Sequence, residues 1–295
     1  MNRLDKWLDL LGIKQYNTPL LREEFMPLST TIEEKEQALA ALLQEYGTLA
    51  VAYSGGVDSS YLAEIAHETL GEQVRLILAD SPSIPRAELN EAIELANEKG
   101  WPLTVIKTQE FENEAFLAND GKRCYWCKTE LFTRMNQFAQ ENQIQILAYG
   151  EIADDALDPT RYGAQAAREH QVVAPLAEVD FFKEEIRQRS KERGLPTWDK
   201  ASFACLSSRF PTGTRVEVKE MTKVEKAEEA LKGKGFHQYR ARHHGDLCRI
   251  EVDPADLERF QDEATRQQVV DAITAAGYRY VTLDLMGYRT GSTAD

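Results

Sequence analysis

A short stretch near position 50 constrains the fold of this chain more than any other. Residues 50–53 form an apolar run typical of a β-strand, and the six residues from Ser54 to Ser59 read SGGVDS. Apolar residues then recur at helical spacing as far as Leu70. The stretch therefore predicts a strand, a tight polar turn and a helix that begins inside the turn.

This turn has the composition of a phosphate-binding loop. Gly55 and Gly56 let the backbone approach a bulky anion without a Cβ atom in the way. Ser54, Ser59 and the free N–H groups of the first helical turn can donate hydrogen bonds to that anion. Asp58 fits a phosphate that arrives with Mg²⁺ rather than a bare one. The loop is not a Walker loop, because G-x-x-x-x-G-K-[ST] is absent, and the alternative is a Gly-Gly turn capped by serine.

SGGxDS between a strand and a helix resembles the PP-loop of the N-type ATP pyrophosphatases. Members of that superfamily split ATP between its α and β phosphates and adenylate a substrate. The resemblance implies ATP and Mg²⁺ as cofactors.

The chain around this loop alternates between apolar strands and helices. We expect strands over 74–79, 103–107 and 144–149, and helices over 86–99, 125–140 and 183–193. This alternation predicts an α/β fold with a parallel sheet and helices on both faces. Ligands of such sheets lie beyond the carboxyl ends of the strands, where the SGGVDS turn, Asp80 and residues 150–155 should converge.

Three parts are expected along the chain. Residues 1–30 form an N-terminal extension with a short amphipathic helix near 4–11, and 31–200 form a PP-loop ATP pyrophosphatase domain of the adenine nucleotide alpha hydrolase type. Residues 201–295 form a smaller α+β domain for substrate binding or oligomerisation. Its expected elements are helices over 219–232 and 254–275 and strands over 237–242, 247–252 and 278–285.

Composition narrows the functional classes. The net charge of −14 argues against a broad surface for tRNA or DNA. No apolar run approaches a membrane span and no signal-peptide pattern is present, so we expect a cytoplasmic protein. The 4 cysteines of such a chain are typical of metal binding or catalysis rather than disulfides.

The cysteines leave several interpretations open. Residues 122–128 read KRCYWCK, and this CxxC pair, Cys124 and Cys127, could be a redox pair, half a zinc site or two ligands of an iron–sulfur cluster. Cys205 lies in an irregular segment that must fold back over the first domain. Three thiolates would leave one iron of a four-iron cluster without a protein ligand. Inert thiols are the remaining alternative, and Cys248, in an alternating strand, is expected to be a small buried hydrophobe.

Charged residues suggest two further features. Arg240 and Arg242 are two apart on an expected strand and therefore share a face, which suits a phosphate or carboxylate or else is merely solvated. Residues 151–174 are acidic, with Asp154, Asp155 and Asp158. This loop is either a solvated turn or the source of a carboxylate for Mg²⁺.

Four segments together resemble one family within the PP-loop superfamily. They are SGGVDS, the KRCYWCK region, KEEIRQRSKERGLPTWDK and ACLSSRFPTGT. The chain resembles the LarE family over about residues 32 to 290. Its members are ATP-dependent sulfurtransferases that convert pyridinium-3,5-biscarboxylic acid mononucleotide to its thiocarboxylate form, for the nickel-pincer cofactor of lactate racemase.

The family contains two kinds of enzyme, and this sequence is similar to the second. In the first kind a cysteine in the ACLSSRFP region gives up its own sulfur and becomes dehydroalanine. In the second kind three cysteines hold a [4Fe-4S] cluster that carries an extra sulfide. Ala204 takes the place of the sacrificial cysteine here. The resemblance therefore implies Cys124, Cys127 and Cys205 as cluster ligands.

The resemblance also assigns further roles by position. Five residues would hold the ATP pyrophosphate: Ser54, Gly55, Gly56, Asp58 and Ser59. Lys128 and Arg209 would neutralise phosphate or the reacting carboxylate, with Cys205 beside them, and Arg240, Arg242 and Glu228 would face the phosphate and ribose of the substrate. The sequence departs from the family at Tyr162, at Thr212 and over 150–153, which concerns the exact substrate.

The expected reaction is acyl adenylation followed by displacement of AMP by sulfide. A sulfide donor and a homo-oligomeric assembly are expected as partners. The alternatives are a PP-loop tRNA thiolase, an amide-forming PP-loop ligase with a structural zinc, and a nucleotide-binding protein without enzymatic activity.

Overall fold

The computed structural model of the chain describes residues 31–156, 162–200 and 204–289. The expected N-terminal extension, with its helix near 4–11, lies outside these residues, as does Asp158. Within the described part no helix is both long and apolar enough to span a bilayer.

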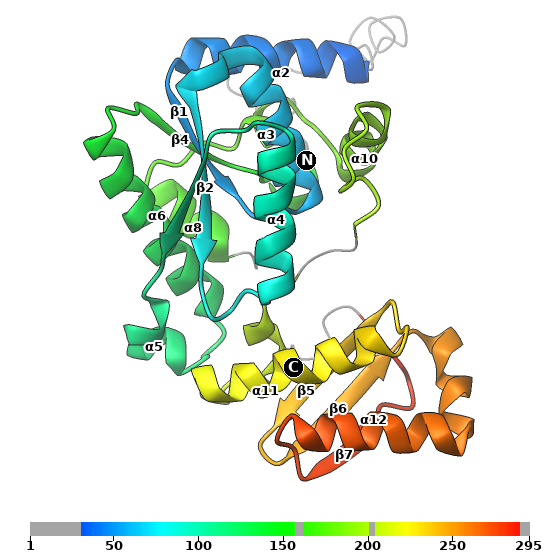
Figure 1. The fold of residues 1–295 in the computed structure, drawn as a ribbon. Coiled ribbons are helices and arrows are strands. Elements are labelled where there is room, and N and C mark those ends of the chain that lie inside the picture. Colours follow the sequence, from blue (N-terminus) through cyan, green and yellow to red (C-terminus); the bar gives the residue numbers. More distant parts are fainter. Residues whose placement is uncertain (1–30, 157–161, 201–203, 290–295) are drawn as a thin grey trace, which may run out of the picture.

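A four-stranded parallel sheet forms the centre of the first unit (Figure 1). Its strands are β1 (Leu49–Tyr53), β2 (Val74–Asp80), β3 (Leu103–Lys107) and β4 (Ile146–Tyr149). They follow the order β3-β2-β1-β4, and all pairs are parallel. β1 is central and almost wholly buried, as its LAVAY sequence predicts. The expected α/β fold is confirmed.

Helices cover both faces of this sheet (Figure 1). On one face lie α2 (Ile32–Tyr46), α3 (Val57–Leu70), α4 (Arg86–Glu98) and α10 (Lys183–Glu192), and on the other α6 (Arg123–Glu141) and α8 (Tyr162–Glu169). Each face has its own apolar core, with Leu39, Tyr61 and Phe181 in the first and Phe132 and Met135 in the second. Because all four strands run parallel, their carboxyl ends lie at one edge of the sheet.

Short helical turns fill the connections. They are the 3₁₀ turns η2 (Gly71–Gln73) and η3 (Glu110–Glu112) and the helices α5 (Glu114–Leu117), α7 (Ala153–Ala156) and α9 (Pro175–Glu178). The polar segment 151–174, expected as a loop, thus contains helical turns as well as α8. Sequence period did not predict them, because turns of four residues span barely one helical repeat.

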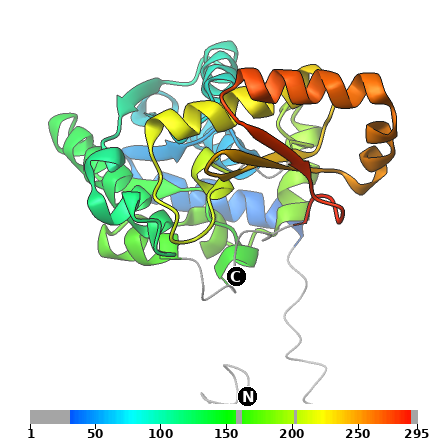
Figure 2. The ribbon, with the colours of Figure 1, turned by 90° about the horizontal axis from the view of Figure 1, so that it is seen from below.

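The second unit is a three-stranded sheet with two helices packed next to each other on it (Figures 1 and 2). Its elements are η4 (Leu206–Arg209), α11 (Val218–Gly233), β5 (Tyr239–His244), β6 (Leu247–Val252), η5 (Pro254–Gln261), α12 (Glu263–Ala275) and β7 (Tyr280–Leu283). β5 and β6 are antiparallel, whereas β7 runs parallel to β6. The α+β character expected from the sequence is present.

The single helix expected over 254–275 is wrong. The structure has a 3₁₀ turn as far as Gln261 and then a separate helix from Glu263. Asp262 separates them, because its carboxylate accepts a hydrogen bond from the N–H of Thr265 at 2.7 Å and caps a new helix.

The connecting segment 204–216 is bonded to the first unit along its length. The N–H of Leu206 donates to the Ser83 carbonyl at 2.8 Å, and that of Val216 to the Leu117 carbonyl at 2.9 Å. Phe116 and Leu117 of α5 also belong to the apolar core of the second unit. The two units are therefore joined by backbone hydrogen bonds and by shared core residues.

Glu36 of α2 is the centre of a half-buried ion network that ties α2, α3 and α10 together. Its carboxylate accepts hydrogen bonds from Tyr61 at 2.6 Å, from Arg189 at 2.8 Å and from Arg193 at 2.6 Å. Burial alone would raise the pKa of Glu36, but these hydrogen bonds outweigh it and lower the pKa to about 2.

This network should make the fold sensitive to acid. The folded pKa lies below the ordinary value of 4.5, so the stabilisation is complete above about pH 4.5 and is lost as pH falls toward 2. Glu36→Gln should remove at most about 3 kcal/mol at neutral pH and flatten this loss. Urea unfolding at a series of pH values measures it, with the exposed Glu94→Gln on α4 as control. An unchanged pH dependence in Glu36→Gln would contradict the assignment.

Candidate active site

The turn after β1 has the geometry of an anion-binding loop. Gly55 adopts φ +69°, and a Cβ at this position would lie 2.6 Å from the Cβ of Ala92 on α4. Only glycine fits there, both for its conformation and for the close approach of α4. α3 begins at Val57 with no side-chain cap, so the N–H groups of its first turn point into the loop.

The two serines of the loop bond to each other across the turn. Their Oγ atoms are 3.0 Å apart, and the N–H of Ser54 donates to Ser59 Oγ at 3.2 Å. The hydroxyls are therefore preorganised and can turn from each other toward a phosphate oxygen. The phosphate-binding role expected for both residues stays a prediction.

The end of β4 lies against the same loop. A Cβ at Gly150 would approach the backbone N of Ser59 to 3.0 Å and would crowd Asp58 as well. Beyond it, the N–H of Ala153 donates to the Phe181 carbonyl at 2.9 Å. The expected convergence of the SGGVDS turn with residues 150–155 is therefore present.

Asp58 has a partner that sequence reasoning missed. Lys183 Nζ lies 2.8 Å from Asp58 Oδ1 and 2.6 Å from Oδ2. The backbone N–H of Lys183, the first residue of α10, donates to Asp154 Oδ2 at 2.8 Å. Lys183 thus joins the PP-loop to the loop after β4. The sequence signal was that Lys183 begins both an expected helix and the family-like segment KEEIRQRSKERGLPTWDK.

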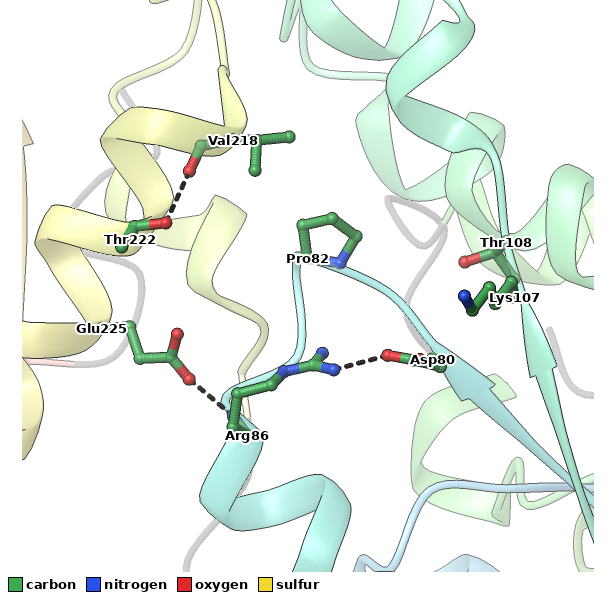
Figure 3. Close-up of a pocket in the computed structure, with 8 residues that line it drawn as sticks. All are labelled: Asp80, Pro82, Arg86, Lys107, Thr108, Val218, Thr222 and Glu225. Atoms are coloured by element: carbon green, nitrogen blue, oxygen red, sulfur yellow. Dashed lines mark hydrogen bonds and ion pairs between the residues drawn. The ribbon is translucent and has the colours of Figure 1, made fainter.

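Asp80 lies at the same edge of the sheet and lines a cavity. A cavity of about 400 Å³ opens where β2 and β3 end and α11 passes over them, lined by Asp80, Pro82, Arg86, Lys107, Thr108, Val218, Thr222 and Glu225. Figure 3 shows Arg86 bonded through its side chain to Asp80 and through its backbone to Glu225. None of the five PP-loop residues lines this cavity. Asp80 therefore faces this cavity and is paired with Arg86.

The three predicted cysteine ligands influence one another electrostatically. Cys124 and Cys127 are three apart near the start of α6 and share a helix face. Burial raises the pKa of the Cys127 thiol strongly, with further contributions from Glu110, Cys205 and Cys124. Burial and Cys205 likewise raise the pKa of Cys124, although its side chain reaches solvent. Arg123 Nη1 also donates to the Ser207 carbonyl at 2.7 Å, so the CxxC pair and the Cys205 segment, two separate parts of the chain, lie near one another.

The donor set of this neighbourhood suits a thiolate-bound group. Metal binding removes protons from thiols, and the positive end of the α6 dipole and the adjacent Arg123 favour the anions that result. Within the described residues, however, no three His, Cys, Asp or Glu side chains are placed to hold a metal ion. The cluster remains a prediction.

Arg209 and Glu228 form a buried ion pair. Arg209 Nε donates to Glu228 Oε1 at 2.8 Å and Nη2 donates to Oε2 at 3.0 Å. Arg209 Nη1 donates to the carbonyl oxygens of Ala204 at 2.7 Å and Cys205 at 3.2 Å. Both charged residues therefore hold the cysteine-bearing segment in place, and a contact with substrate would require these bonds to open.

Arg240 and Arg242 share a strand face, as expected, but their surroundings differ. Arg242 is buried and paired with Glu251 at 2.8 Å, and it donates to the Ser208 carbonyl at 3.0 Å. Arg240 is half-buried over the Tyr288 ring and makes no ion pair within residues 31–156, 162–200 and 204–289. Burial, together with the neighbouring Arg209, lowers the pKa of its guanidinium. A merely solvated strand face is therefore excluded.

Arg240 lines a second cavity, of about 150 Å³, between the two units. Ala204, Leu206 and Arg209 of the cysteine-bearing segment form another part of its wall, and Glu228 of α11 a third. Anionic ligands entering this cavity would meet the guanidinium of Arg240 beside the segment that carries Cys205.

Lys128 lies one residue after the CxxC pair. Its Nζ is 4.3 Å from the centre of the Tyr149 ring, and its side chain packs over Gly163, where a Cβ would lie 2.9 Å from Lys128 Cδ. Cys248 is fully buried in the apolar core of the second unit, as expected. His243 is buried and His244 is exposed, as expected for adjacent residues that point to opposite faces of β5.

Comparison with known proteins places the chain. No family model matches it. It is 33% identical over 269 residues to pyridinium-3,5-bisthiocarboxylic acid mononucleotide synthase of Lactiplantibacillus plantarum, covering 90% of this chain and 95% of that protein. The chain belongs to the LarE family. It is also 38% identical over 260 residues to an uncharacterised Synechocystis protein, covering 88% of this chain and 97% of that one.

A more distant relative matches only part of the chain. The GMP synthase of Brucella melitensis is 28% identical over 185 residues, which cover 55% of this chain and 36% of that enzyme. This partial match is consistent with the PP-loop fold of the first unit.

The close approach at Gly55 can be tested by substitution. Gly55→Ala should lower the free energy of unfolding by roughly 1–3 kcal/mol, because the new methyl meets both an unfavourable φ and Ala92. Gly71→Ala is the matched control, since its φ is +56° but nothing lies within 4 Å of the added Cβ. Denaturant unfolding of both variants measures the difference. Equal losses would show that the contact with α4 contributes nothing.

Proposed function

We propose that this protein is an ATP-dependent sulfurtransferase that acts on a carboxylate of pyridinium-3,5-biscarboxylic acid mononucleotide, for nickel-pincer cofactor biosynthesis. The observation that supports this most is the location of Cys205. Its segment is bonded to Ser83 after β2 and to the start of α6, where Arg123 Nη1 donates to the Ser207 carbonyl at 2.7 Å. The cysteine-bearing segment and the PP-loop thus lie at the same edge of one sheet, which supports a sulfur transfer at the nucleotide site.

The first step activates the carboxylate. A substrate carboxylate oxygen attacks the α-phosphorus of ATP, the bond from the α-phosphorus to the oxygen bridging to the β-phosphate breaks, and pyrophosphate leaves with the electron pair. Ser54, Ser59 and the N–H groups at the start of α3 stabilise the charge on that leaving group. Mg²⁺ would be held by Asp58 and would supply further positive charge.

The second step forms the carbon–sulfur bond. A sulfur nucleophile attacks the acyl carbon of the adenylate, and AMP departs with the electrons of the broken C–O bond. When bound, a [4Fe-4S] cluster on Cys124, Cys127 and Cys205 would carry the extra sulfide for this transfer. Ala204 cannot donate sulfur, so the protein does not consume itself at that position.

Substrate binding is assigned chiefly to Arg240. Its guanidinium has no carboxylate partner among the described residues, so a substrate phosphate would supply the missing charge. Arg209 and Glu228 form part of the wall of the same cavity, and Arg242 holds the neighbouring Ser208 carbonyl. Lys128, at the start of α6, would neutralise the reacting carboxylate. We further propose that a sulfide donor supplies the sulfur and that the protein assembles as a homo-oligomer.

One alternative is favoured by a specific observation. The partial likeness to GMP synthase fits an amide-forming PP-loop ligase, in which the cysteines would hold a structural zinc. Iron, zinc and acid-labile sulfide measured in anaerobically purified protein distinguish the two. Zinc without sulfide would support the ligase.

Separating the two steps tests the sulfurtransferase directly. With ATP, Mg²⁺, substrate and sulfide, Asp58→Asn should abolish pyrophosphate release, because Mg²⁺ loses its ligand. Replacing Cys124, Cys127 or Cys205 by Ala should abolish thiocarboxylate formation while pyrophosphate is still released. Pyrophosphate assay and mass spectrometry of the product measure the two steps. Cys248→Ala is the control and should be nearly silent, whereas dehydroalanine at Cys205 in step with product would overturn the cluster mechanism.

The two arginines of β5 should behave differently. Arg240→Ala should weaken binding of the mononucleotide by about 1.5–3 kcal/mol with little change in stability, because a charge-assisted hydrogen bond is lost. Arg242→Ala should destabilise the protein by about 3–5 kcal/mol, because it leaves the Glu251 carboxylate buried without this partner. Calorimetric titration and thermal unfolding measure the two effects. The reverse pattern would move the substrate contact to Arg242.

A further inference from the structure

We propose that Lys183 is a phosphate-binding residue that exchanges partners when MgATP enters the site: it neutralises Asp58 in the nucleotide-free protein and then contacts the β,γ-phosphates. This inference rests on the proposed ATP chemistry and adds a residue to it. It starts from the ion pair between α10 and the PP-loop.

The ion pair between Lys183 and Asp58 is bidentate. Lys183 Nζ binds both oxygens of the Asp58 carboxylate, at 2.8 and 2.6 Å, with side-chain exposures of 31% for Lys183 and 22% for Asp58. The backbone of Lys183 is fixed by its hydrogen bond to Asp154. The helix start is thus held in place, and the flexible four-carbon stem of Lys183 carries its ammonium to the loop.

Mg²⁺ and Lys183 compete for the same oxygen atoms. Mg²⁺ takes carboxylate oxygens as direct ligands, and an ammonium bonded to both oxygens of Asp58 weakens Mg²⁺ binding by charge repulsion and by using part of their lone pairs. The arrival of MgATP therefore favours movement of the ammonium away from Asp58. The nearest new anion is the phosphate chain that the loop has just bound, and the four-carbon stem of lysine allows the short movement.

This exchange would serve the proposed reaction at the leaving group. As the bond at the α-phosphorus breaks, the electron pair moves onto the departing pyrophosphate, and a nearby ammonium stabilises that charge. No proton needs to be transferred. Until MgATP binds, the same ammonium neutralises the Asp58 carboxylate, which lies beside the anion-binding loop.

Two binding measurements with opposite signs test the exchange. Mn²⁺ replaces Mg²⁺ as a paramagnetic probe, and α,β-methylene-ATP replaces ATP because it cannot be split. In Lys183→Gln, Mn²⁺ alone should bind more tightly than in wild type, because Asp58 is freed. Affinity for α,β-methylene-ATP with Mg²⁺ should fall about 10- to 100-fold, as expected for one lost charge-assisted hydrogen bond. If Lys183 were purely structural, its replacement by Gln would not raise the affinity for Mn²⁺.

Lys99 provides a matched control. It pairs with Glu64, also on α3, at 3.0 Å, with exposures of 27% and 19%, and thus resembles the Lys183–Asp58 pair in burial. Lys99→Gln should leave both affinities unchanged. Lys183→Arg keeps the charge and should retain most of the nucleotide affinity, and equal losses in the Arg and Gln variants would overturn the proposal. Unchanged Mn²⁺ and nucleotide binding in Lys183→Gln would also overturn it.

The result can be separated from the fate of the proposed function. If the wild-type protein releases no pyrophosphate with the mononucleotide, the sulfurtransferase proposal fails. Lys183 would still be assigned to the phosphates by a fall in nucleotide affinity and a rise in Mn²⁺ affinity.

Discussion

The site depends on how closely three backbone segments can approach one another at the carboxyl edge of the sheet. β1 ends in a turn that touches α4 at Gly55, and β4 ends at Gly150 against the first residues of α3. A single methyl at either position would meet protein atoms at 3.0 Å or less. Because no side chain separates these segments, the N–H groups of the α3 start and the serine hydroxyls all face one small space. Its shape favours an anion with several oxygens.

Buried charge holds the second half of the site. The segment that carries Cys205 has little regular structure of its own, and its carbonyl oxygens accept hydrogen bonds from Arg209 and Arg242. The charges of these two arginines are neutralised by Glu228 and Glu251. Buried pairs of this kind add little net stability compared with apolar side chains, but losing one partner is costly. Their value here is geometric, since they fix the Cys205 segment relative to α6.

Sequence period predicted the regular part of the fold and little of the contact pattern. β3 and β6 match their expected ranges, because apolar alternation and buried runs are local properties. The helix break at Asp262 was missed because a carboxylate cap resembles any other acidic helix residue until its hydrogen bond is known. Lys183 was missed for a stronger reason: its partner Asp58 is 125 positions away, and no local pattern encodes such a pair.

The arginines illustrate the same limit at the substrate side. Arg240 and Arg242 look alike in the sequence, and their shared strand face was correctly expected. Only packing separates them: Glu251, fully buried on β6, takes up the charge of Arg242, while Arg240 extends over Tyr288 into a cavity. Within the described residues other cations, such as the exposed Lys122 and Lys226, also make no ion pair, but Arg240 is half-buried and lines a cavity. The charges that remain available for an incoming ligand therefore identify a binding site better than the number of basic residues in its sequence.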